Sequence, residues 1–120
     1  MIRLLSVIGV VLVAGGLAHS AGVIQLYVSV GVPAANRVLL DIWIAEAQLL
    51  SGTLYIAASR AMRARSEWRA LAVFGALSII GFAAPMVPVL VARAPLIFRV
   101  PDIIYLVVSL FILVRAMRSA

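Results

Sequence analysis

The side chains best suited to chemistry lie in and beside one apolar segment, residues 38–59. They are Arg37, Asp41, Glu46, Gln48 and Tyr55. A segment of this length can cross a bilayer as a helix, where an acidic group costs at least a few kcal/mol. Such groups persist in hydrocarbon only where a partner, a water cavity or a function holds them. The segment is therefore the first place to look for a proton or cation site, a polar ligand site, or a buried polar network.

A helix over residues 38–59 gathers polar and small side chains into one stripe. The stripe consists of Arg37, Asp41, Gln48, Ser51, Gly52, Tyr55 and Ser59. Arg37 and Asp41 are four residues apart, so they can form an ion pair on the helix surface. A polar stripe in a membrane helix either holds two helices together by hydrogen bonds or lines a cavity for a polar or amphipathic molecule. The pattern favours the helix contact and leaves the cavity as the alternative.

Glu46 points about 140° away from Asp41 around the same helix, so the two are not a catalytic carboxylate pair. A single acidic group near mid-membrane can carry a proton or a cationic substrate. It can equally stay neutral and hydrogen-bonded across an interface, or pair with a partner chain. The structural role is favoured, and coupled transport remains open.

Composition places the whole chain in lipid. Hydrophobic residues make up 66% and charged residues 12%, against about 45–50% and about 25% in a soluble domain. The net charge of +6 comes from arginines that bracket apolar runs, which sets topology and does not form a nucleic-acid face. The use of Arg without Lys indicates a GC-rich bacterial source. The chain has no Cys, which excludes disulfides, thiolate metal sites and thiol nucleophiles.

Arginines divide the sequence into four predicted spans. They cover about residues 4–24, 38–59, 70–92 and 97–114. The last apolar run, Val100–Val114, is short for a bilayer and must extend upstream to Leu96–Phe98. Pro101 and Asp102 then suit the first turn of that helix. Pro85 and Pro88 are expected to kink or end the third helix. Gln25–Asn36 is expected to lie at the interface between the first two spans.

Orientation follows from the arginines. With four spans, both termini and the loop after residue 59 share one side. That side carries Arg3, Arg60, Arg63, Arg65, Arg69, Arg115 and Arg118. The other side carries Arg37, Arg93 and Arg99. The larger group predicts cytoplasmic termini, with the Arg60–Arg69 loop against anionic headgroups and Trp68 as an interfacial anchor. A cleaved leader ending near Ala18-His19-Ser20 is the alternative for the first span.

Small residues also follow helical faces. The first span has Ser6, Gly9, Gly16 and Ser20 on one arc, and the third has Ala72, Gly75, Ala76 and Ala83. Both arcs predict close helix packing. The fourth span has Asp102, Tyr105 and Ser109 on one face. His19 is the single histidine and is expected to hydrogen-bond at the interface. No metal-ligand spacing, phosphate loop or nucleophile elbow is present, so the sequence predicts no cofactor.

One resemblance covers about the first half of the chain. Val30-Gly31-Val32-Pro33, then Asn36-Arg37, and Leu50-Ser51-Gly52-Thr53-Leu54 at the end of the second span carry it. In this layout the chain resembles small four-helix bacterial membrane proteins of the DoxX-like group. Arg37 and Gly52 match the Arg and the Gly that these proteins often have in their second span. The resemblance implies a fold and little about function.

Together these patterns predict an all-α protein: a four-helix transmembrane bundle with both termini cytoplasmic. It would form one integral membrane domain over residues 1–120, multi-pass in a bacterial inner membrane. The leading function is a non-catalytic subunit or accessory protein whose partners are the lipid bilayer and another membrane protein or further copies of itself. A small transporter or ligand-binding protein using Glu46 is the alternative. A membrane enzyme acting on a lipid-like substrate is the third option.

Overall fold

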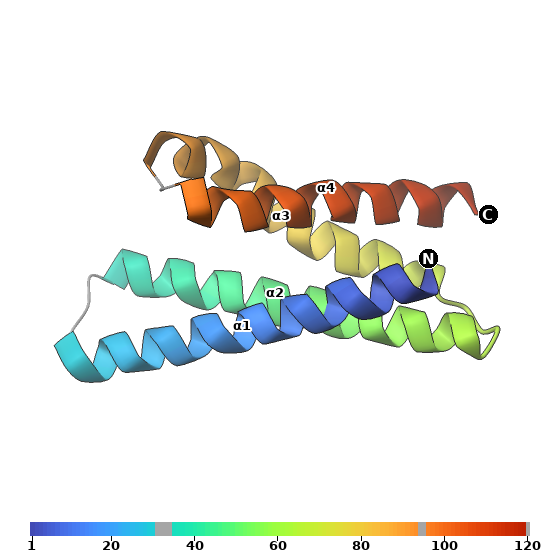
Figure 1. Cartoon of the computed structure of the whole chain (residues 1–120), viewed down its shortest axis with the longest axis horizontal. Helices are drawn as coiled ribbons and strands as arrows, with labels where there is room; N and C mark the ends of the chain where they lie inside the picture. The colour runs from blue at the N-terminus through green and yellow to red at the C-terminus, as the bar shows by residue number, and fades with distance from the viewer. Residues whose placement is uncertain (31–34, 94–95, 120) are drawn as a thin grey trace.

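The computed structural model of the chain is all-helical. It describes residues 1–30, 35–93 and 96–119, and within these the side chains of residues 1–22, 42–82 and 100–119. Across these ranges there are four helices: α1 (Ile2–Val30), α2 (Ala35–Arg63), α3 (Arg69–Arg93) and α4 (Leu96–Arg118). The molecule is elongated, 49 × 27 × 20 Å, with both termini and the α2–α3 turn at one end (Figure 1). Its length matches a bilayer with its headgroup regions, about 40–45 Å.

Glycines set the spacing of α1 and α2. A Cβ atom on Gly9 would lie 2.8 Å from the carbonyl oxygen of Gly52, and one on Gly52 would lie 2.7 Å from the carbonyl oxygen of Gly9. A Cβ on Gly16 would meet the carbonyl oxygen of Ala45 at 2.9 Å. The two backbones therefore touch directly, which only a residue without a side chain permits. The close packing predicted from Gly9 and Gly16 is confirmed.

The core lies where all four helices contribute small and branched side chains. Its fully or almost fully buried members are Leu5, Ile8, Leu12, Tyr55, Ala58, Ala72, Ala76, Ile79, Ile112 and Ala116. Ala72, Gly75 and Ala76 are buried as their stripe predicted, and the side chain of Ala83 lies outside the described residues. Helix α2 packs against both α1 and α3, and α4 packs against α3. Helix α2 is thus the central element.

The turn between α2 and α3 is tightly hydrogen-bonded. The N–H of Ser66 donates to the carbonyl of Ala61 at 2.9 Å, and Arg65 between them has a φ of 54°. This is a Schellman ending with an arginine at the left-handed position that glycine usually takes. The Glu67 carboxylate then accepts the N–H of Arg69 at 3.1 Å and caps the start of α3.

One sequence prediction about helix ends needs correction. Helix α4 does begin at Leu96, so Pro101 lies inside it and not in its first turn; the apolar length that a long helix needs outweighs one missing N–H bond. Helix α3 does not end at Pro85 or Pro88 but continues to Arg93, and the kink expected there stays a prediction. Helix α1 continues to Val30, so the first part of the predicted interfacial segment is helical.

Two helices are long and apolar enough to cross a membrane: Ile2–Gly22 of α1 and Val100–Arg118 of α4, within the residues whose side chains are described. The described part of α3, Arg69–Phe82, is apolar but shorter. These lengths are consistent with a membrane protein.

Candidate functional site

The inner face of α2 carries the predicted polar stripe. Gln48, Ser51, Gly52, Tyr55 and Ser59 are all buried. The predicted face is therefore confirmed for the residues whose side chains are described. The structure divides it into two regions, a hydrogen-bonded half toward the α2–α3 turn and a half that borders a cavity.

In the hydrogen-bonded half each buried hydroxyl of α2 has a partner on a different helix. Ser51 donates to the carbonyl oxygen of Gly75 on α3 at 2.7 Å. Tyr55 donates to Ser109 on α4 at 2.9 Å. Ser59 shares a hydrogen bond of 2.5 Å with Ser6 on α1. Helix α2 is thus joined to each of the other three helices by at least one hydrogen bond.

The Ser6 hydroxyl also receives a bond from outside the core. The Arg63 guanidinium donates to it at 3.3 Å. Ser6 is half-buried, whereas Arg63 is exposed at the end of α2. The hydrogen-bonded half therefore ends in an arginine at the molecular surface, where water can solvate the charge.

In the second half, α1, α2 and α4 surround a cavity of about 370 Å³. Its polar lining consists of His19, Gln48, Asp102 and Tyr105, from three different helices. Gln48 is only 5% exposed, and its Oε1 has no hydrogen-bond partner. A buried amide oxygen without a partner costs about 1–3 kcal/mol. Polar groups from three helices thus converge in this cavity, and one of them has no partner; the other buried atom without a partner among the described residues is Nε of Arg69, beside the α2–α3 turn.

Gly15 shows where that unpartnered oxygen lies. A Cβ on Gly15 would be 3.0 Å from Gln48 Oε1, and Gly15 itself lines the cavity. The amide therefore reaches from α2 across to α1 at the cavity wall. Glycine at position 15 leaves room for the amide there.

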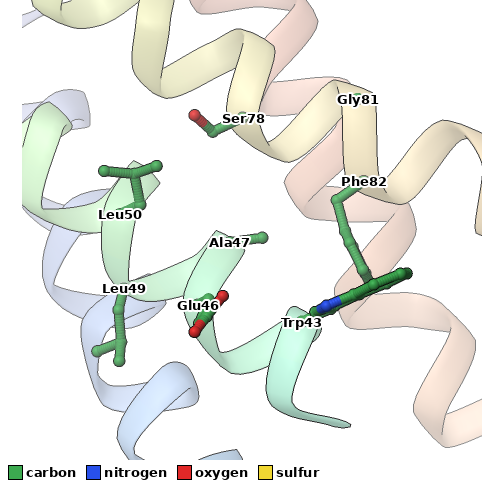
Figure 2. Close-up of a pocket in the computed structure, with 8 residues that line it drawn as sticks. All are labelled: Trp43, Glu46, Ala47, Leu49, Leu50, Ser78, Gly81 and Phe82. Atoms are coloured by element: carbon green, nitrogen blue, oxygen red, sulfur yellow. The ribbon is translucent and has the colours of Figure 1, made fainter. Parts of the chain in front are cut away.

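Glu46 lies on the opposite side of α2. It is exposed and lines an open groove of about 690 Å³ between α2 and α3. Figure 2 shows Trp43, Glu46 and Leu50 on the α2 side, with Ser78, Gly81 and Phe82 on the α3 side. Most of these neighbours are apolar, and Trp43 and Leu50 are themselves 58% and 55% exposed. Glu46 is a carboxylic acid on an apolar outer surface.

The predicted site residues therefore fall into separate places. Gln48 and Tyr55 share the buried face of α2, whereas Glu46 is on the outer face. Of the roles left open for Glu46, its exposed position on the outer face of α2 leaves the pair with a partner chain and the transport role as predictions. Arg37 and Asp41 belong to α2 by their backbone, but their side chains lie outside the described residues. The predicted pair between them stays a prediction.

His19, Asp102 and Tyr105 were assigned lesser roles from the sequence. The face formed by Asp102, Tyr105 and Ser109 was visible as a helical pattern, and the structure turns it toward α2. His19 gave no such signal, because a single residue has no periodicity. Only the approach of α1 and α4 to α2 brings these groups to one cavity.

Within the described side chains, no three His, Asp or Glu residues are grouped as a metal site would require. The Ser20 hydroxyl donates to the carbonyl of Gly16 one turn earlier at 2.9 Å. That bond occupies its proton within α1. His19 and Asp102 thus share a cavity without a nucleophilic serine hydrogen-bonded to them.

Comparison of the chain with protein-family models, with curated proteins and with solved structures finds no match. The resemblance to the DoxX-like group stays a prediction. Function has to be argued from the two regions around α2 described above.

Proposed function

We propose that the protein is an integral membrane subunit that crosses the bacterial cytoplasmic membrane four times and binds another membrane protein through the groove around Glu46. The length of the molecule and the two strongly apolar helices support membrane insertion. The exposed Glu46 in an apolar groove is the observation that carries the binding role.

Charge distribution supports cytoplasmic termini. One end of the molecule holds the N-terminus, the C-terminus and the α2–α3 turn (Figure 1). Its arginines are Arg3, Arg60, Arg63, Arg65, Arg69, Arg115 and Arg118. All except Arg69 are exposed, as residues facing cytoplasm and anionic headgroups would be. Trp68 packs at the edge of the core at this end, which suits an interfacial anchor.

This topology has a direct test in the native chain, which contains no cysteine. Arg65→Cys places a thiol in the exposed α2–α3 turn. We expect a membrane-impermeant maleimide to label it in inside-out vesicles and not in intact spheroplasts. Labelling in intact spheroplasts would contradict cytoplasmic termini.

Glu46 requires a neighbour because of where it lies. It is close to the middle of residues 38–59, so in a membrane its carboxyl group faces the hydrocarbon core. The groove residues around it offer large apolar surface, with Trp43 and Leu50 more than half exposed. A partner helix that carries a hydrogen-bond donor or a cation at this depth would satisfy the carboxyl group and cover the groove.

The groove favours a different protein over a second copy. Two-fold pairing through this face would bring two Glu46 carboxyl groups together. Head-to-tail pairing would offer Glu46 the outer faces of α1 or α4. Large apolar side chains are exposed along these helices, among them Val10, Leu17, Val107 and Phe111, and His19 of α1 is an exposed side chain that can donate a hydrogen bond. A two-fold pair therefore supplies no donor for Glu46, and a head-to-tail pair supplies one only if His19 of the second copy meets it.

Photo-crosslinking in native membranes tests the partner. Trp43→p-benzoylphenylalanine places the probe in the groove, and Val107→p-benzoylphenylalanine places it on α4, where Val107 is 59% exposed. We expect the Trp43 probe, and not the Val107 probe, to give one adduct with a different membrane protein. Glu46→Leu should lower the adduct at least tenfold, and Glu46→Gln should lower it less because an amide still hydrogen-bonds.

The partner's side of the contact completes the test. The crosslinked segment should carry a basic or amide side chain whose replacement by Leu lowers the adduct to the same degree as Glu46→Leu. An adduct of two copies of this 12.8 kDa chain contradicts the heterologous partner. An adduct that does not depend on Glu46 contradicts the role of the groove.

A transport role that joins Glu46 to the polar stripe receives no support from the geometry. Glu46 and Gln48 are two residues apart and so point nearly opposite ways around α2. Glu46 faces the outer groove, and Gln48 faces the internal cavity. The same separation argues against an enzyme that uses both.

A further inference from the structure

The cavity between α1, α2 and α4 has the features of a binding site that is independent of the Glu46 groove. It has its own set of polar groups, contributed by three helices: His19, Gln48, Asp102 and Tyr105. We propose that this cavity binds a small organic cation, an amine with an apolar body.

The unpartnered Gln48 amide is the first argument. Its Oε1 is an acceptor at a residue that is only 5% exposed, and it has no donor in the protein. Native proteins rarely leave such a group unsatisfied. An N–H donor of a ligand in the cavity would complete it, and an alkylammonium group has up to three such donors.

The charge of the cavity is the second argument. Asp102 is half-buried on α4, and among the lining residues whose side chains the structure describes it is the acidic one and none is an arginine. A cation is therefore attracted and an anion repelled, and the low-dielectric surroundings strengthen both effects. Tyr105 adds an aromatic ring, which binds organic cations through its face.

The remaining lining selects an organic cation over a metal ion. Ala18, Ile44 and Pro101 are apolar and cannot coordinate a metal or its hydration shell. His19 and Asp102 are two ligands, and the described side chains form no group of three. Apolar walls instead suit the hydrocarbon part of an amine. The volume of about 370 Å³ falls in the lower range of small-molecule pockets.

The single histidine gives a readout at the cavity wall. We would label His19 with ¹⁵N and titrate the wild-type protein in detergent micelles with benzylammonium chloride. Benzyl alcohol serves as the uncharged probe of similar size. We expect a saturable shift of the imidazole resonances with benzylammonium and no saturable shift with the alcohol. No saturable shift with benzylammonium means a cavity that holds water only, which overturns the proposal.

Matched carboxyl variants separate the cavity from general charge effects. Asp102→Asn should raise the Kd for benzylammonium at least tenfold. Glu46→Gln removes an acidic residue from the outer groove and should change the Kd less than twofold. Equal effects of the two variants overturn the assignment of Asp102, whatever the outcome for the partner of Glu46.

Two further measurements test the proposal even if the Asp102→Asn variant does not fold. Ala18→Phe fills the cavity from an exposed wall position and should abolish the saturable shift with every polar group retained. In the wild-type protein, benzylammonium should slow carbethoxylation of His19 by diethylpyrocarbonate at least fivefold. Unchanged carbethoxylation at saturating benzylammonium overturns the proposal.

Discussion

The two halves of the inner face of α2 have similar residues and different structures. From Ser51 to Ser59 the three buried hydroxyls are hydrogen-bonded to other helices, and Gly9 and Gly52 bring the backbones of α1 and α2 into contact. At Gln48 the same face borders a cavity and an amide oxygen has no partner. Helix α1 touches the α2 backbone in both halves, at Gly52 and at Ala45. The difference therefore lies in which groups face α2: Ser109 of α4 and Gly75 of α3 partner the hydroxyls, whereas the groups around Gln48 leave a space.

This comparison separates polar residues that hold a bundle together from those that are available to a ligand. A hydroxyl group that is hydrogen-bonded to a neighbouring helix contributes to stability and is not available to bind a ligand. A buried amide without a partner lowers stability, and a protein retains it where the amide contributes to binding a ligand. Sequence alone assigns Gln48 and Tyr55 to one stripe, and only the packing distinguishes their roles.

The largest predicted effect on stability comes from a substitution that disrupts the hydrogen-bonded half. Gly52→Leu should destabilise the protein by about 3 kcal/mol or more, because the new side chain meets the backbone of α1 at Gly9 and Val13, which cannot move aside. The measurement is unfolding by denaturant in mixed micelles. Gly22→Leu is the control, since a Cβ there has open space, and it should not destabilise. Equal stability of both variants would contradict the close contact.

A smaller effect should follow from removing one interhelical bond. Tyr55→Phe should cost about 0.5–1 kcal/mol, because its hydroxyl no longer donates to Ser109 on α4. Ser109→Ala should cost a similar amount. In a double-mutant cycle the second change should add little to the first. Full additivity would show that the two hydroxyls do not interact.

In the cavity half, removing a polar side chain should have the opposite effect on stability. Gln48→Leu should leave stability unchanged or raise it by up to about 1 kcal/mol, because the change removes a buried acceptor that has no donor. The same denaturant measurement applies, with Ser51→Ala as the matched loss of a satisfied polar group on this face. A loss of more than about 1 kcal/mol in Gln48→Leu would mean that the amide is satisfied in the folded protein.

The smallest expected change in stability comes from replacing Gly15 of α1 by alanine, and Gly9 of the same helix is the comparison. Gly15→Ala should change stability by less than about 0.5 kcal/mol, because its Cβ meets the end of the Gln48 side chain beside a cavity, and the better helix propensity of alanine offsets the contact. Gly9→Ala meets the backbone of α2 and should be clearly destabilising. If the two variants unfold at similar temperatures, the helices are packed equally closely at Gly9 and Gly15, which contradicts the difference between the two halves.

The sequence predicted the four helices and the buried face of α2 because both depend on periodicity, which is a local property. It also predicted the packing role of Gly9 and of Gly75. It misplaced Pro101, since the extent of α4 depends on total apolar length. It missed the grouping of His19 with Asp102, because these residues are far apart in the chain and meet only through the tertiary arrangement. Glu46 was recognised, but which way it faces depends on where α3 lies.

The backbone contact between Gly9 and Gly52 also bears on how the protein is made. It joins two helices that are consecutive in the chain, so both partners exist once synthesis passes Arg63, before α3 and α4 have emerged. Contacts between neighbouring segments form with little loss of chain entropy. The first hairpin can therefore form as a preassembled unit, against which α3 and α4 then dock.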